Sequence, residues 1–264
     1  MKDLQHIKCF LFDMDGTIYL GNDLLPGMPE FFPKLQTAGK KFFFLTNNSS
    51  RTHAEYVTKL SKLGFPAERE SILISTDGAM AWLQEHCPGG KLFISGQPGF
   101  EKTFREAGFC LTEGLEDPPD YILLAFDKTL TYDKLEIICR LIDRGVPFLA
   151  THPDVRCPME GGEFVPDLGG TLALIKAATK REPLEIFGKP YGHLVNLVMS
   201  KTGCRKDEIA MVGDRLNTDI AFGKLNGLTS ILVLSGETRR EDVAEAQYQP
   251  DVILENTQDI LGLI

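Results

Sequence analysis

Two carboxylates, Asp13 and Asp15, stand two positions apart directly after an apolar run in the stretch FLFDMDG. The run from Lys8 to Phe12 reads as a short buried strand, so both carboxylates lie at its carboxyl end, and Gly16 lets the backbone turn after them. In open α/β sheets this edge is where ligands bind. Because close carboxylates repel each other unless a cation neutralises them or one takes up a proton, the stretch predicts a metal site.

A calcium loop also begins with D-x-D, but the residues that follow argue against one here. The next ligand position would be Thr17, the position that requires glycine is Ile18, and no helix precedes the stretch. A helix cap is the other ordinary reason for a carboxylate after a strand. Taken alone, the stretch leaves a metal site and a cap open.

Three further strand ends carry residues of complementary chemistry: Thr46 after KKFFFLT, Lys189 in FGKP and Asp214 in VGDRLNTD. Taken singly, Thr46 and Lys189 fit ordinary turn and surface positions. Together, the four ends supply what phosphoryl transfer needs. Asp13 would attack phosphorus to form an aspartyl-phosphate, and Asp15 would reach the leaving oxygen. Thr46 offers a hydroxyl, Lys189 binds phosphate and offsets carboxylate charge, and Asp214 completes an oxygen-ligand set for Mg²⁺.

The elements that must position these residues alternate between strands and helices. Strands are predicted for short apolar runs, and helices for segments whose apolar residues recur three or four positions apart. Such alternation predicts an α/β fold with a doubly wound, mainly parallel, Rossmann-like sheet. The predicted strands cover residues 8–12, 40–46, 71–75, 91–95, 120–126, 147–151, 184–190, 208–214 and 230–234. Predicted helices include 77–86, 132–143, 171–179, 219–225 and a closing helix, with a loop over 160–170.

The four strand ends with candidate catalytic and binding residues fall in the two terminal parts of the chain. Residues 1–82 and 183–264 are therefore predicted to form the catalytic core, and residues 83–182 an inserted α/β cap domain. Gly and Pro cluster in CPGG, residues 87–90, near the start of the insertion. Closure of the cap over the core would exclude bulk water and supply contacts to the leaving group.

Composition narrows the classes of function. With 28 Lys and Arg against 37 Asp and Glu, the net charge is −9, and without a basic patch no nucleic-acid partner is expected. The N-terminal stretch lacks the pattern of a signal peptide and no run of about 18 apolar residues occurs, so we expect a cytoplasmic protein without a membrane partner. The six cysteines are scattered and expected to be reduced, and neither they nor the five histidines have the spacing of a zinc site.

The order of the motifs resembles a known family. DMDGT, TNN, GKP and GDRLNTD, in that order, are similar to the four motifs of the haloacid dehalogenase superfamily. The agreement is close with its phosphatase branch named after the N-acetylglucosamine operon and 4-nitrophenyl phosphate, whose large α/β (C2-type) cap resembles the insertion. FDKTLTY at 126–132 and ATHPD at 150–154 resemble segments of that cap. The resemblance implies a Rossmann-like core, Mg²⁺ as cofactor and phosphatase activity.

The resemblance also implies a role for each residue of the motifs. Asp13 would be the nucleophile and Asp15 the general acid and base. Mg²⁺ would be held by Asp13, the backbone carbonyl of Asp15 and Asp214, and Asp219 would support these ligands without touching the metal. The phosphoryl group would be bound by residues from the other strand ends: Thr46, Asn47, Lys189, Arg215, Leu216, Asn217 and Thr218.

The predicted function is Mg²⁺-dependent hydrolysis of small phosphomonoesters, such as sugar phosphates or, in vitro, 4-nitrophenyl phosphate, through an aspartyl-phosphate. Asp15 argues against the dehalogenase branch, which lacks this acid. A mutase and a receiver module that stores the acyl phosphate remain alternatives, although a receiver carries its acceptor on a later strand. SGQPGFEKT departs from a P-loop because Glu101 stands where glycine is required. The leaving group of the substrate stays open, and the cap face could serve either as a homodimer contact or as solvent surface.

Overall fold

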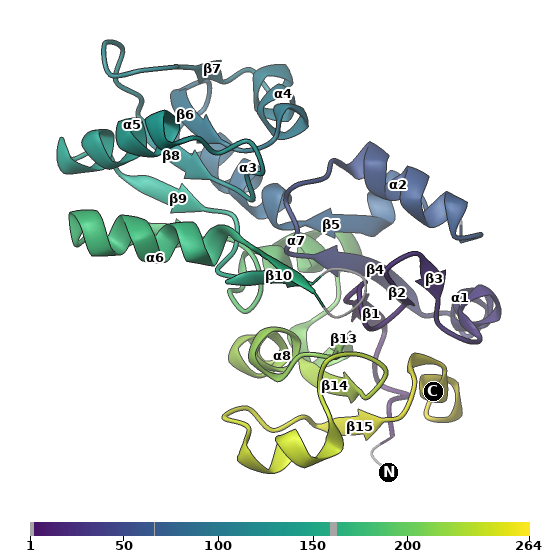
Figure 1. Ribbon diagram of the computed structural model, residues 1–264. Helices are drawn as coiled ribbons and strands as arrows, with labels where there is room; N and C mark the ends of the chain where they lie inside the picture. The colour runs from purple at the N-terminus through teal and green to yellow at the C-terminus, as the bar shows by residue number, and fades with distance from the viewer. Residues whose placement is uncertain (1–2, 66, 159–162) are drawn as a thin grey trace. The chain divides into compact units, whose positions relative to one another are not determined.

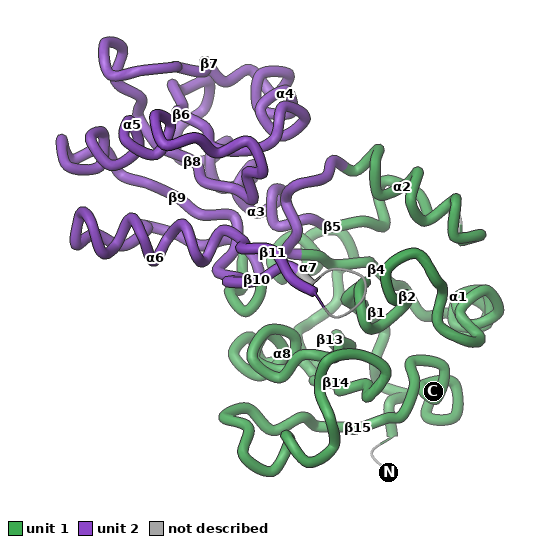
Figure 2. Tube along the Cα trace, viewed as in Figure 1, with its two compact units in different colours: residues 1–46, 53–73, 189–264 green, residues 47–52, 74–188 purple. Residues whose placement is uncertain are grey.

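The computed structural model describes residues 3–65, 67–158 and 163–264, which form two compact units (Figure 2). Unit 1 takes in the described residues of 1–46, 53–73 and 189–264, and unit 2 those of 47–52 and 74–188. The boundary predicted between residues 82 and 83 falls inside a helix of unit 2, α3 (Ser75–His86). The assignment of the units as catalytic core and cap stays a prediction.

The sheet of unit 1 has six strands in the order β15-β14-β13-β1-β4-β5. β1 pairs in parallel with β13 on one side and β4 on the other, which places Phe10 opposite Ala210 and Phe42. The carboxyl ends of β1, β4 and β13 therefore lie side by side at one edge of the sheet. The strands are β1 Cys9–Phe12, β4 Lys41–Thr46, β5 Ile72–Ile74, β13 Ile209–Gly213, β14 Thr229–Val233 and β15 Val252–Leu254 (Figure 1).

Helices cover both faces of this sheet because successive side chains of β1 point to opposite faces. Cys9 and Leu11 pack with residues of α7 and α8 in one apolar cluster. On the other face, the Phe12 ring makes edge contacts with Phe31 and Phe32 of α1, with ring centroids 5.6 and 5.3 Å apart. The helices of unit 1 are α1 Met28–Thr37, α2 His53–Lys62, α7 His193–Thr202 and α8 Ala221–Asn226.

Unit 2 has a sheet of its own, with strands in the order β12-β9-β8-β6-β7 and parallel pairing throughout. Leu123 of β8 packs with α3 and α4 on one face, and Leu124 packs with α5 and α6 on the other. The elements are β6 Lys91–Ser95, α4 Pro98–Glu106, β7 Cys110–Leu111, β8 Tyr121–Leu124, α5 Tyr132–Asp143, β9 Phe148–Ala150, α6 Leu168–Thr179 and β12 Glu185–Ile186.

Two small antiparallel hairpins complete the strands. β2 (Tyr19–Leu20) pairs with β3 (Asp23–Leu24) in unit 1, and β10 (Arg156–Pro158) pairs with β11 (Phe164–Pro166) in unit 2. β11 lies within the loop predicted over residues 160–170, so that prediction is wrong there, and residues 160–162 lie outside the described residues. Helix α6 begins earlier than the predicted residue 171 because Asp167 Oδ1 accepts a hydrogen bond from the N–H of Leu168 at 2.6 Å.

Two other predictions about the elements are wrong. The strand predicted over residues 184–190 is short and belongs to the sheet of unit 2, where β12 pairs with β9. The predicted closing helix is replaced by strand β15 between two 3₁₀ turns, Arg240–Glu245 and Thr257–Gly262. The α/β fold class, with mainly parallel sheets and helices on both faces, is confirmed.

None of the helices in the described parts of the chain is long and apolar enough to cross a membrane. All six cysteines are free thiols, as predicted.

Candidate active site

Asp13 directly follows β1, which is an interior strand of the unit 1 sheet. Its N–H still donates to the carbonyl of Val212 in β13 at 2.9 Å, while its side chain is 14% exposed. The chain then turns at Gly16, whose φ of +80° lies in the left-handed region that favours glycine. The carboxylate of Asp13 is thus held by a strand and remains accessible from one side.

Lys189 is a buried cation shared between two carboxylates. Its Nζ donates to Asp13 Oδ1 at 2.5 Å and to Asp219 Oδ1 at 2.7 Å, and its side chain is only 2% exposed. A longer contact of 3.4 Å reaches the carbonyl oxygen of Leu45 in β4. The prediction that Lys189 ends a strand of the core sheet is wrong, because it follows β12 of unit 2 and precedes α7.

Asp214 directly follows β13, the neighbour of β1, and is 2% exposed. Its Oδ2 accepts a hydrogen bond from the N–H of Glu237 at 2.7 Å, whereas its Oδ1 is buried without a hydrogen-bond partner among the described residues. Two glycines make room for this carboxylate: a Cβ on Gly16 would lie 2.3 Å from Oδ2, and one on Gly236 would lie 2.0 Å from it. Because a buried carboxylate oxygen without a donor is costly, Oδ1 is positioned for a cation.

Asp219 is fully buried in the short π-helical turn Leu216–Ile220 that follows Asp214. Besides the contact of its Oδ1 with Lys189, its Oδ2 accepts a hydrogen bond from the N–H of Arg215 at 3.1 Å. Both oxygens of Asp219 are therefore already engaged by donors of the protein, whereas Asp214 keeps one oxygen open.

The charges of this cluster do not balance. One carboxylate oxygen each of Asp13, Asp214 and Asp219 lies within 4.8 Å of the others. Burial raises the pKa of Asp214, and the charges of Asp13 and Asp219 raise it further; burial also raises the pKa of Asp219 against the opposing effect of Lys189. Burial acts to lower the pKa of Lys189 and Arg215, but the carboxylates outweigh it and raise both. Three carboxylates against two cations leave an excess of negative charge, which favours the binding of a cation.

Asp15 has a different environment from the other acids. Partial burial raises its pKa, Lys59 opposes this shift, and Asp13 adds to it. More than a third of the Asp15 surface is nevertheless exposed, so solvent screens these interactions. Lys59 itself lies over the ring of Tyr19, with Nζ 3.8 Å from the ring centroid. A carboxyl group with a raised pKa that solvent and substrate can reach is suited to proton transfer.

Two of the predicted phosphate-binding residues follow β4 directly, and they fall in different units. Thr46 ends β4 in unit 1 and is 8% exposed. Asn47 belongs to unit 2, is buried, and donates through Nδ2 to Asp154 Oδ1 at 3.1 Å. The binding roles of both residues stay predictions.

Residues 215–218 were predicted to bind the phosphoryl group, but not all of their side chains are available to contact it. Arg215 forms an ion pair with Glu237, with Nε and Oε2 3.1 Å apart. The side chain of Leu216 packs against the apolar cluster that contains Val243, so only its backbone could meet a phosphate. Asn217 is exposed and Thr218 is half-buried.

Sequence reasoning missed two groups of polar residues. The first is the segment after β14: besides the Glu237 N–H on Asp214, the hydroxyl of Ser235 donates to the carbonyl of Gly16 at 2.8 Å. Its signal is another apolar run that ends in small and polar residues, SILVLSGET. The second is a buried cluster in unit 2 around His152 and Asp167, whose residues are ordinary when considered one at a time.

Comparisons with known proteins agree with the motifs. A family model described as haloacid dehalogenase-like hydrolase matches residues 10–110, and a second, HAD-hydrolase-like model matches residues 186–260. An acid sugar phosphatase of Staphylococcus aureus is 31% identical over 247 residues, which cover 94% of each chain. The match therefore extends over both units.

Solved structures show the same fold in phosphatases. A 4-nitrophenylphosphatase from Thermotoga maritima superposes with a TM-score of 0.93 at 40% identity and covers 98% of each chain. A glycerol phosphate phosphatase from Mycobacterium tuberculosis, solved in complex with magnesium, gives a TM-score of 0.88 at 29% identity and covers 98% of this chain and 78% of that one. The chain belongs to the haloacid dehalogenase superfamily, in its sugar-phosphate and 4-nitrophenyl phosphatase branch, and is a phosphoric monoester hydrolase.

Proposed function

We propose that the chain is a Mg²⁺-dependent phosphatase of small phosphomonoesters that works through an aspartyl-phosphate on Asp13. The observation that carries this proposal is the arrangement around Lys189. Its ammonium is shared between Asp13 and Asp219, and the neighbouring Asp214 keeps a buried oxygen for which the described residues supply no donor. A nucleophile, a phosphate-binding cation and a metal ligand are thus supported by one cluster.

The donor set fits Mg²⁺, which prefers carboxylate and carbonyl oxygens and usually keeps several waters. Asp13, the backbone carbonyl of Asp15 and Asp214 would hold the ion. Asp219 would not touch the ion, since both its oxygens already accept hydrogen bonds from Lys189 and from the N–H of Arg215. It would instead hold neighbouring groups of the site in place. The magnesium in the related glycerol phosphate phosphatase supports this choice of metal. When bound, Mg²⁺ would neutralise charge on the carboxylates and on the phosphoryl oxygens.

The proposed reaction has two steps. A carboxylate oxygen of Asp13 forms a bond to phosphorus while the bond from phosphorus to the alcohol oxygen breaks, and Asp15 gives its proton to that oxygen. A water molecule then attacks the phosphorus of the aspartyl-phosphate and gives a proton to the Asp15 carboxylate. The bond from phosphorus to the Asp13 oxygen breaks in this step and releases the Asp13 carboxylate. The products are the alcohol and inorganic phosphate, and both aspartates return to their starting states.

The remaining predicted residues would bind and orient the phosphoryl group. Lys189 would face its negative charge while Asp219 holds the ammonium in place. The hydroxyl of Thr46 and the carboxamide of Asn47 would donate to its oxygens, and residues 215–218 would line the same side of the site.

The substrates are proposed to be small phosphorylated metabolites, including sugar phosphates. This proposal draws on the activities of the relatives, an acid sugar phosphatase, a 4-nitrophenylphosphatase and a glycerol phosphate phosphatase. Unit 2 would act as the cap that contacts the leaving group. The six free thiols support a cytoplasmic location, because reducing compartments keep cysteines unpaired.

The test is phosphate release from a panel of sugar phosphates, glycerol phosphate and 4-nitrophenyl phosphate, with Mg²⁺ and with a chelator in its place. The proposal expects many turnovers per enzyme with Mg²⁺ and loss of turnover with the chelator. A single labelling of the protein without further turnover would instead indicate a receiver module. Transfer of phosphate within the substrate without release would indicate a mutase.

A further inference from the structure

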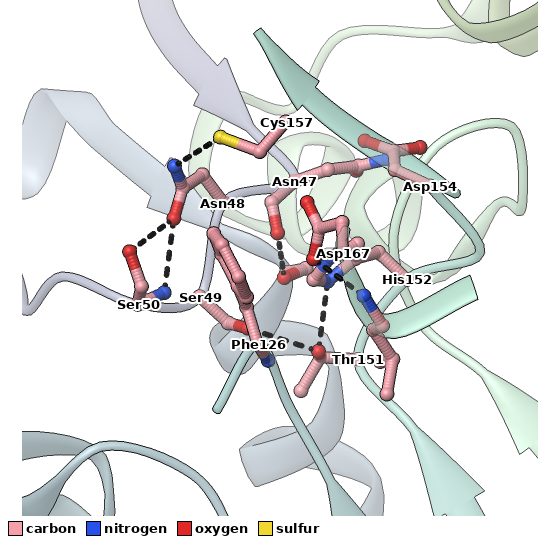
Figure 3. Close-up of polar contacts among 12 residues, drawn as sticks. Asn47, Asn48, Ser49, Ser50, Phe126, Thr151, His152, Asp154, Cys157 and Asp167 are labelled. Carbon is pink, nitrogen blue, oxygen red and sulfur yellow. Dashed lines mark hydrogen bonds and ion pairs between the residues drawn. The ribbon is translucent and has the colours of Figure 1, made fainter. Parts of the chain in front are cut away.

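A second polar cluster lies within unit 2, at the carboxyl end of β9 (Figure 3). It is built around His152 and Asp167, which are 0% and 5% exposed, and includes the half-buried Asp154. Ligand atoms of these three residues lie within 4.8 Å of one another, which is also compatible with a metal. Their atoms already have partners in the protein, however, and those partners define a chain of hydrogen bonds.

When His152 is neutral, each group in this chain of hydrogen bonds has a fixed role as donor or acceptor. Because an ionised Asp167 can only accept, His152 Nε2 donates to Asp167 Oδ1 at 2.9 Å, and its Nδ1 is then an acceptor for the hydroxyl of Thr151 at 2.9 Å. Thr151 in turn accepts from the hydroxyl of Ser49 at 3.1 Å, and Ser49 accepts from the N–H of Phe126 at 3.0 Å. Each side chain in this series therefore has a hydrogen-bond partner. The hydrogen bonds join segment 47–52 to residues 151–152 and to the start of α6.

The segment that carries Asp154 is also held by close backbone contacts. The N–H of Gly169 in α6 donates to the carbonyl of Asp154 at 2.7 Å, and a Cβ on Gly169 would lie 2.3 Å from the carbonyl oxygen of Pro153. At Gly188, a Cβ would lie 2.8 Å from Cβ of His152. Residues 151–154 are thus fixed on two sides by contacts that leave no space for a larger residue.

Asn47 is held at two points by this part of unit 2. The hydroxyl of Ser75 donates to the backbone carbonyl of Asn47 at 2.8 Å and so fixes the main chain. Asp154 Oδ1 accepts from Asn47 Nδ2 at 3.1 Å and so fixes the orientation of the carboxamide. An amide that is oriented before the substrate arrives loses less entropy when it binds a phosphoryl oxygen.

We propose that Asp154 is a positioning residue for Asn47, and that the chain from Ser49 to Asp167 holds Asp154 in the place where it can act. This inference rests on the proposed phosphatase function and on the phosphoryl-binding role of Asn47. It adds that a carboxylate outside the catalytic motifs controls catalysis through the orientation of one amide.

The test is a double-mutant cycle of Asn47→Ala and Asp154→Leu, measured as kcat/KM with 4-nitrophenyl phosphate. Leu has the same branching and the same number of side-chain heavy atoms as Asp but cannot accept a hydrogen bond, so Asp154→Leu is expected to lower kcat/KM about tenfold or more. In the Asn47→Ala background, the same substitution is expected to change kcat/KM by less than about twofold, because the residue it positions is gone. The inhibition constant of inorganic phosphate should rise in both single variants.

Two further variants separate positioning from general damage to the fold. Asp154→Asn keeps an acceptor oxygen and is expected to retain most of the activity that Asp154→Leu loses. Asp117→Asn alters another carboxylate of unit 2, one that is 61% exposed and paired with Lys91, and is expected to leave kcat/KM unchanged. Melting temperatures of all variants are measured alongside. If Asp154→Leu does not fold, Asp154→Ala, which also removes the acceptor, takes its place in the cycle.

The outcomes distinguish this inference from the function on which it rests. Equal losses from Asp154→Leu in both backgrounds, or no loss in either, would overturn the positioning role while leaving an active phosphatase. An active wild-type protein in which Asn47→Ala changes neither kcat/KM nor phosphate inhibition would overturn it as well. Absence of phosphatase activity in the wild-type protein would overturn the proposed function itself.

Discussion

Lys189 Nζ lies 2.5 Å from Asp13 Oδ1, although the two residues are 176 positions apart in the sequence. Asp219 shares the same ammonium at 2.7 Å, so one buried cation joins residues from the first and last parts of unit 1. Because Lys189 and Asp219 are almost completely buried, their ion pair offsets the cost of removing both charges from water. Catalysis and stability are therefore linked at this point.

Lys189→Met should abolish turnover and also destabilise the protein. The substitution leaves the buried carboxylate of Asp219 and the partly buried carboxylate of Asp13 without their common partner. Removing one member of a buried ion pair typically costs about 3–5 kcal/mol. Urea unfolding measures the loss, with Lys102→Met as a control because that lysine is 73% exposed. Equal unfolding free energies for Lys189→Met and the wild-type protein would contradict the buried cluster.

Asp214→Asn should abolish Mg²⁺ binding while making the metal-free protein less sensitive to pH. Burial and the charges of Asp13 and Asp219 raise the folded-state pKa of Asp214 above its unfolded value. The folded state thus binds more protons, and its stability falls as pH rises from the unfolded pKa through the folded one. Between pH 5 and 8, roughly, the wild-type protein without metal should lose more stability than the variant.

Melting temperatures at several pH values, with Mg²⁺ and with a chelator, check this prediction. Mg²⁺ should raise the melting temperature of the wild-type protein but not that of Asp214→Asn. A shift with Mg²⁺ that is as large in the variant would mean that the ion binds elsewhere.

Asp15→Asn should slow both halves of the reaction, and the first half more for poor leaving groups. A positioned acid or base typically contributes about 10²–10⁴ in rate. Since 4-nitrophenolate leaves without much help from an acid, the variant should still form the aspartyl-phosphate from 4-nitrophenyl phosphate and then hydrolyse it slowly. Rapid mixing would show a burst of nitrophenolate followed by a slow phase, whereas unchanged steady-state rates would argue against the role of Asp15.

Gly236→Ala should weaken Mg²⁺ binding without removing any ligand. The added Cβ would lie 2.0 Å from Asp214 Oδ2, so the carboxylate must move. Titration calorimetry or the Mg²⁺ dependence of turnover measures the effect, with Gly114→Ala as the matched control because a Cβ there has no described heavy atom within 4 Å. If both variants bind Mg²⁺ as the wild-type protein does, the proposed placement of the metal on Asp214 is wrong.

His152→Leu should destabilise the protein by about 1–3 kcal/mol, because it removes one hydrogen-bond partner from the buried Thr151 hydroxyl and one from the buried Asp167 carboxylate. His6→Leu is a control at an exposed histidine and should change the unfolding free energy by less than about 0.5 kcal/mol. Chemical denaturation measures both. A stability of His152→Leu within that same range would contradict the buried hydrogen-bond chain.

The sequence was most informative where a local pattern determines the structure. The apolar run before Asp13 predicted both the strand and the position of the carboxylate at its end, and the alternation of strands and helices predicted the α/β fold. The side chains of β1 alternate between two faces of the sheet, and both faces are buried. Nearly any pairing register of β1 with its neighbouring strands therefore leaves Asp13 at the same edge of the sheet.

Sheet membership and side-chain orientation depended on tertiary contacts that no local pattern encodes. LEIF has the apolar character of a core strand, yet β12 pairs with β9 in the sheet of unit 2. Leu216 lies within a motif, but the π-helical turn points its side chain into an apolar cluster. His152 and Asp167 meet only because α6 begins beside the end of β9, and a lone histidine in the sequence gives no sign of this.

The most direct test of the mechanism is to trap the phosphorylated enzyme. Asp15→Asn is mixed with radiolabelled substrate and Mg²⁺, quenched in acid and digested, and the labelled peptide is identified. The proposed mechanism predicts a label on Asp13 that requires Mg²⁺, is absent from Asp13→Asn, and decays in the wild-type protein as phosphate is released. A label on another residue, or phosphate release that persists in Asp13→Asn, would contradict it.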